Sequence, residues 1–164
     1  MSVAIIMGSS SDASVMDEAV QTLRSFSVPF QVRVLSAHRT PDATLAFARG
    51  AAGAGIKVII AAAGGVVPLA GVVAAATPLP VVGVPIAPAS GGGLDALLAL
   101  AQMPESVPVA TVAVNGARNA ALLAVRIMAL SDERLSAELD RFVVDLADQV
   151  LDMDAEIVAR YPAG

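Results

Sequence analysis

The sequence predicts an α/β fold in which helices cover a doubly wound parallel sheet, with a long helix at the C-terminal end. Apolar runs of strand length alternate along the chain with segments of helical periodicity. Of the 164 residues, 56% are hydrophobic but only 3% are aromatic, which favours tight packing of helices on a sheet. The length is that of one domain, so we expect a single domain over residues 1–164.

The first predicted strand covers residues 3–7 and is followed by the polar turn 8–12. A helix comes next, because apolar residues recur three and four positions apart, at Val15, Met16, Ala19, Val20 and Leu23. The second strand covers residues 30–35. The loop after it leads into a helix that ends near residues 53–55, and Thr40-Pro41 has the pattern of an N-cap and first helical residue.

Two further strands are predicted at residues 58–62 and 81–84, with helices at 69–76 and 94–103. No charged residue occurs from position 58 to position 94, a length that could cross a membrane. Prolines interrupt this segment and prevent a continuous helix, so we expect short buried strands and no membrane span. A strand at 109–114 and a helix at 119–130 complete the sheet.

The segment from Asp132 to about residue 158 has the pattern of one long helix. One face is acidic, and the other carries an apolar stripe of Leu135, Leu139, Phe142, Val143, Leu146, Val150 and Leu151. The stripe could pack on its own domain or on a neighbouring subunit. We favour the neighbour, because a sizeable exposed apolar stripe usually marks an interface. Residues 1–130 would then form the α/β core, and residues 131–160 an intersubunit extension.

Composition excludes several kinds of function. A net charge of −5 argues against nucleic acid as a partner, since nucleic-acid binding needs a clustered basic face. The absence of cysteine excludes disulfides, thiol catalysis and thiolate metal sites, and fits a cytoplasmic protein. The first residues show no signal-peptide pattern.

His38 is the only histidine, and histidine is the side chain whose ordinary pKa lies near neutrality. It is therefore the first candidate for proton transfer, with the Ser36 hydroxyl and the Arg39 guanidinium as neighbours suited to an anionic substrate. The alternative is a plain helix-entry loop. No nucleophile elbow or acidic partner accompanies His38, so we expect neither a catalytic triad nor a metal site.

The turn at residues 8–12 follows a strand and precedes a helix, so its hydroxyls and free amides could hold a phosphate. Asp12 would suit ribose hydroxyls better than the anion itself. Considered without the neighbouring loops, this turn has the pattern of an ordinary Ser/Asp N-cap. Gly64-Gly65 follows the third strand, so three such loops should meet at the carboxyl edge of the sheet, where ligands bind in this class of fold.

Six segments resemble the PurE family of purine biosynthesis, in the family's order. They cover residues 7–12 (MGSSSD), 36–41 (SAHRTP), 77–85 (TPLPVVGVP), 93–98 (GLDALL), 102–104 (QMP) and 119–123 (NAALL). The resemblance implies a three-layer flavodoxin-like fold, a homo-octamer that exchanges C-terminal helices, and an isomerase without cofactor or metal. The implied reaction converts N5-carboxyaminoimidazole ribonucleotide to 4-carboxy-5-aminoimidazole ribonucleotide through released CO2.

Carried over by motif, the resemblance implies that His38 transfers the proton and that Ser9 and Asp12 bind the ribose phosphate end of the substrate. Ser11, Ser36 and Arg39 would help at the phosphate, and Gly64 and Gly65 would line the substrate site.

The chain departs from mutases after the third strand, where Pro68 replaces the family's second histidine, and in the loop at 87–93. Two alternatives therefore stay open. One is a direct CO2-dependent aminoimidazole ribonucleotide carboxylase, a class that usually has lysine at the position of Arg39. The other is a catalytically silent nucleotide-binding paralogue.

Overall fold

The computed structural model describes residues 2–65, 69–88 and 90–162, and Pro68 lies outside this part of the chain. Its strands are β1 (Ser2–Met7), β2 (Phe30–Val34), β3 (Ile56–Gly64), β4 (Val81–Ile86) and β5 (Ala110–Thr111). Its helices are the short 3-10 helix η1 (Ser10–Asp12), α1 (Ala13–Ser25), α2 (Pro41–Gly50), α3 (Leu69–Ala74), α4 (Leu94–Ala101), α5 (Ala117–Ala129) and α6 (Glu133–Arg160).

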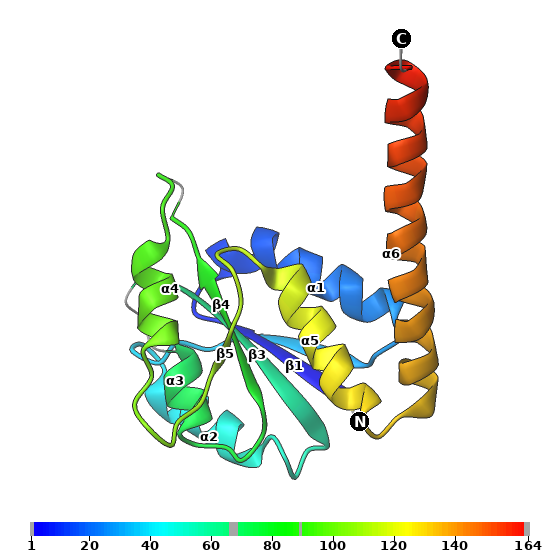
Figure 1. Ribbon diagram of the computed structural model, residues 1–164. Helices are drawn as coiled ribbons and strands as arrows, with labels where there is room; N and C mark the ends of the chain where they lie inside the picture. Colours follow the sequence, from blue (N-terminus) through cyan, green and yellow to red (C-terminus); the bar gives the residue numbers. More distant parts are fainter. Residues whose placement is uncertain (1, 66–68, 89, 163–164) are drawn as a thin grey trace.

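The five strands form one parallel sheet in the order β2-β1-β3-β4-β5 (Figure 1). The predicted doubly wound fold with a long C-terminal helix is therefore confirmed. The chain moves outward from β1 to β2 and then in the opposite direction from β3 to β5. The loops after β1 and β3 diverge at this reversal, which is where ligands bind in open α/β sheets.

Two layers of helices cover the sheet, with α1 and α5 on one face and α2, α3 and α4 on the other (Figure 1). Side chains alternate along β1, so Val3 and Ile5 enter the core under α1 and α5, while Ala4 and Ile6 enter the opposite core. Four fully buried alanines let α5 lie close to the sheet: Ala117, Ala120, Ala121 and Ala124.

Helices leave most of β2 uncovered at the edge of the sheet. Four of its five residues are exposed, including Val32 and Val34. The cause is helix placement, because α1 packs mainly on α5 and α2 packs on α3. An edge strand with two exposed valines is therefore left open on the single chain.

β5 is much shorter than the predicted strand at 109–114. Beyond Thr111 the chain still follows β4, since the Val112 amide donates to the Gly83 carbonyl and the Asn115 amide to the Pro85 carbonyl. In a β-strand, the amide and the carbonyl of one residue point toward the same neighbouring strand. The Pro85 carbonyl points toward β5, so the position of its missing amide does too. Pro85 has no N–H to donate toward β5, so the regular ladder stops.

The uncharged stretch 58–94 contains most of β3, then α3 and β4. Within the described residues, no helix is both long and apolar enough to cross a membrane.

α6 divides into a packed base and a free end. Leu135 is fully buried, Leu139 and Phe142 pack against the core under α1 and α5, and the Asp132 carboxylate caps the helix by accepting from the Leu135 amide at 3.1 Å. From Val143 onward every residue of the helix is exposed, and Figure 1 shows this part projecting from the body. The predicted stripe therefore packs on its own chain only as far as Phe142.

Candidate active site

A cavity of about 350 Å³ opens at the carboxyl edge of the sheet, where the loops after β1, β2 and β3 meet. It lies at the reversal of strand order between β1 and β3. Its lining consists of Gly8, Ser9, Asp12, Ser36, His38, Arg39, Ala63 and Gly64. The sole histidine therefore shares one cavity with two serines, a carboxylate and a guanidinium.

The loop after β1 is ordered by its own hydroxyls. Ser9 precedes η1, and its Oγ accepts from the Ser11 amide at 3.3 Å. The Ser11 hydroxyl donates to Asp12 at 3.2 Å, and Asp12 is buried at 9% exposure. The turn thus presents hydroxyls and a fixed carboxylate to the cavity at the start of a helix, where backbone amides favour an anion.

Arg39 joins the loop after β2 to the loop after β1. Its amide and its Nε both donate to the Ser36 Oγ, at 3.2 and 3.3 Å, and its guanidinium donates to the Gly8 carbonyl at 2.6 Å. This places a permanently charged fork beside the cavity, within reach of both loops. Such a fork matches the geometry of a phosphate or carboxylate.

The end of β3 lines both this cavity and a second one of about 380 Å³. The two cavities share Asp12 and Gly64, and Ser11 and Gly65 line the second. A side chain at Gly64 would place its Cβ 3.3 Å from the Ile86 carbonyl, so glycine lets the end of β3 lie close to the end of β4 there. All eight site residues predicted from the sequence lie along these two adjoining cavities.

Sequence reasoning missed the roles of Thr40 and Asn115. Thr40 stands at the N-cap position of α2, but its hydroxyl makes no capping bond and turns back to Ser36. The Asn115 side chain accepts from the Ala87 amide at 3.0 Å and so joins the loop after β4, which lines the second cavity, to the turn before α5. The local sequence shows only a Thr-Pro pair and an Asn-Gly turn, which gave no sign of these partners.

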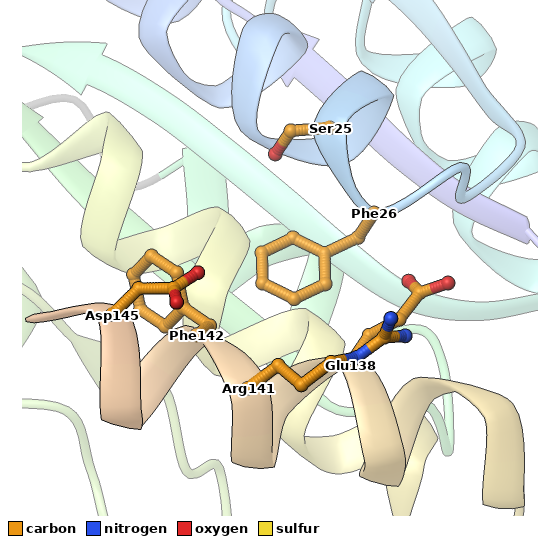
Figure 2. Close-up of a pocket in the computed structure, with 6 residues that line it drawn as sticks. All are labelled: Ser25, Phe26, Glu138, Arg141, Phe142 and Asp145. Atoms are coloured by element: carbon orange, nitrogen blue, oxygen red, sulfur yellow. The ribbon is translucent and has the colours of Figure 1, made fainter.

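A third hollow, of about 380 Å³, lies where α6 leaves the body (Figure 2). The ring of Phe26, at the end of α1, points toward α6 and meets Phe142 edge-on, with 5.6 Å between ring centroids. Glu138, Arg141 and Asp145 line the same hollow. This aromatic contact holds the base of α6 against the end of α1.

The described residues contain no group of three His, Asp or Glu side chains placed to hold a metal ion.

The fold and the two cavities define an α/β protein of the doubly wound class, with a site at its strand-order reversal that combines an imidazole, a guanidinium, a carboxylate and serine hydroxyls. Residues 2–149 match the family described as AIR carboxylase. The chain belongs to this family.

Several curated relatives extend over most of the chain. The N5-carboxyaminoimidazole ribonucleotide mutase of Mycobacterium leprae is 55% identical over 94% of this chain and 91% of its own length. The mutase of Saccharolobus solfataricus is 50% identical over 91% of this chain and 94% of its own length. A phosphoribosylaminoimidazole carboxylase of Saccharomyces cerevisiae is also 50% identical over 91% of this chain, which corresponds to 26% of that longer protein.

The crystal structure of Treponema denticola PurE superposes with a TM-score of 0.85 at 28% identity, covering 94% of this chain and 96% of that one. The resemblance to the PurE family stated from six short segments is confirmed.

Proposed function

We propose that this chain is an N5-carboxyaminoimidazole ribonucleotide mutase of purine biosynthesis that forms 4-carboxy-5-aminoimidazole ribonucleotide. The observation that carries the proposal is the cavity that brings His38 together with Ser9, Asp12, Ser36 and Arg39. It is supported by mutases 50 to 55% identical over at least 91% of the chain.

In this proposal His38 moves the proton in both halves of the reaction. Cleavage of the N–CO2 bond needs a proton at the exocyclic nitrogen, and the bonding pair returns to that nitrogen as CO2 leaves. Ring carbon 4 then attacks CO2, which leaves a proton on that carbon to be removed. One imidazole can donate a proton to the nitrogen in the first half and accept the proton from carbon 4 in the second.

The remaining residues of the cavity would bind the nucleotide. Asp12 and Ser9 suit the ribose end, because a buried carboxylate accepts from hydroxyls and repels a phosphate. Ser11, Ser36 and Arg39 supply hydroxyl donors and a positive charge for the phosphate. Gly64 and Gly65 would let the substrate approach the backbone at the end of β3.

Product formation tests the proposal. Purified protein is given N5-carboxyaminoimidazole ribonucleotide in one cuvette and aminoimidazole ribonucleotide with bicarbonate in another. We expect turnover in the first alone, because Arg39 follows the mutase pattern. Silence in both cuvettes from folded protein would reject the proposal and leave a nucleotide-binding paralogue.

Direct carboxylation is the second candidate, and preference for the second cuvette would establish it. This candidate is supported by the yeast phosphoribosylaminoimidazole carboxylase, which is 50% identical over 91% of this chain.

We also propose that residues 131–160 form an extension of the α/β core that reaches a second copy of the chain in a homo-octamer. On the single chain the free end of α6 leaves an apolar set exposed: Val143, Val144, Leu146, Val150, Leu151, Met153, Ile157 and Val158. Burial of such side chains is favourable by about 25 cal/mol per Å², so a neighbour would stabilise this helix.

Light scattering at micromolar concentration checks the assembly. We expect a particle of about eight times the chain mass of 16.4 kDa. A stable monomer would contradict the proposal.

A further inference from the structure

We propose that Thr40 is the positioning residue for His38: its hydroxyl closes the turn that presents the imidazole to the cavity. The catalytic part of this inference rests on the proposed function, in which His38 transfers the proton. The geometric part stands on the hydrogen bonds of the turn alone.

The first observation is that the Thr40 side chain does not make the helix-capping hydrogen bond expected at its position. A threonine at an N-cap normally accepts from an amide of the first helical turn, which stabilises the helix by about 1 kcal/mol. Thr40 occupies that position before Pro41, yet its side chain makes no capping bond. A local preference left unused suggests that the hydroxyl serves another purpose.

The second observation is where the hydroxyl goes. Thr40 Oγ1 accepts from the Ser36 amide at 3.0 Å and lies 3.2 Å from the Ser36 carbonyl, to which it donates. The Thr40 amide donates to the same carbonyl at 2.9 Å. Three bonds therefore join the first and last residues of a five-residue turn, and His38 is its central residue.

The closed turn is anchored on both sides. Toward α2, the Thr40 carbonyl accepts from the amide and the hydroxyl of Thr44, at 3.0 and 2.9 Å, and Thr44 is fully buried. Toward the cavity, the Ser36 Oγ accepts from Arg39, whose guanidinium reaches the Gly8 carbonyl. Thr40 thus links a buried helix residue to the two loops that line the site.

Removing the hydroxyl would take away two of the three bonds that close the turn. In Thr40→Val, the Ser36 amide loses the acceptor at 3.0 Å and the Ser36 carbonyl loses one of its two donors. Thr40 and His38 are both exposed, so the substitution leaves the buried core unchanged and its effect falls on the position of the imidazole. Misplacement of a catalytic group lowers the chemical rate more than it lowers substrate binding.

Steady-state kinetics on the full-length protein tests the catalytic part. For Thr40→Val we expect kcat to fall about tenfold, the loss that one misdirected hydrogen bond produces, with KM changed less than about threefold. Thr40→Ser keeps the hydroxyl and should recover most of the lost rate. If Thr40→Val retains more than about half of kcat, or if Thr40→Ser is equally slow, the inference is overturned.

Thr77→Val is the matched control. Thr77 also precedes a proline, and its hydroxyl accepts from a backbone amide, that of Leu79 at 3.3 Å. It lies just before β4, at the amino end of the parallel strands, whereas His38 follows β2 at their carboxyl end. The same change of hydroxyl to methyl there should leave kcat and KM as in the wild type.

A second readout does not depend on turnover. His38 is the only histidine, so its ring Cε1–H gives a single, unambiguous resonance in a proton–carbon spectrum. We expect Thr40→Val to move or narrow this resonance, and Thr77→Val to leave it in place. An unchanged His38 resonance in Thr40→Val would overturn the inference, whether or not the wild type is active. Inactivity of the wild type would by itself reject only the proposed function.

Discussion

His38→Asn is expected to lower kcat by about a thousandfold, since positioned acid–base catalysis contributes roughly 10²–10⁴ in rate. Asparagine keeps a planar polar side chain but cannot exchange a proton near neutral pH. The chain has no second histidine to substitute for it. Product formation from N5-carboxyaminoimidazole ribonucleotide measures the loss.

Substrate binding should survive the same change. The groups proposed to hold the nucleotide, above all Arg39, Asp12 and Ser9, remain in the cavity. Calorimetry should therefore give a Kd within about threefold of the wild type, because His38→Asn removes an interaction used in the transition state and not in the ground state. A variant with a tenth or more of the wild-type rate would refute the proposed role of His38.

Leu135→Ala is expected to destabilise the chain by about 3 kcal/mol, within the range for truncating a buried leucine. Leu135 is fully buried in the core beneath α1 and α5, in the first turn of α6. Its loss removes the main apolar anchor of that helix. For a chain of this size the melting temperature should fall by about 10 °C, measured by circular dichroism at fixed protein concentration.

Leu130→Ala provides the control for the same chemical change. Leu130 lies five positions earlier, just after α5, and is 87% exposed. Its truncation should cost no more than about 0.5 kcal/mol. Equal melting temperatures for the two variants would contradict the assignment of Leu135 as the anchor of α6.

The sequence was sufficient to predict the alternating elements, because each strand and helix carries its own period of apolar residues. It also predicted that the loops holding Gly8, His38 and Gly64 would meet, since parallel strands bring their carboxyl ends to one edge. These predictions depend on local pattern and on topology, and both can be read from one chain.

What the sequence could not predict depends on contacts between distant segments. The Thr40 hydroxyl was expected to cap α2, and only the fold shows that Ser36 is its partner. The early end of β5 follows from Pro85 on the neighbouring strand. The apolar stripe of α6 stops packing on its own chain at Phe142 because the body of the protein ends there. The periodicity of apolar residues continues past this point and does not show where the contact stops.

The open edge of the sheet has a consequence for the newly made chain. An uncovered edge strand offers unpaired amides and carbonyls to any other extended segment, which is the usual first step of aggregation. Between its two exposed valines, β2 carries Arg33, also exposed. Two copies stacked in register along this edge would bring identical guanidinium charges together, so a single arginine acts as a gatekeeper against self-association by the wrong surface.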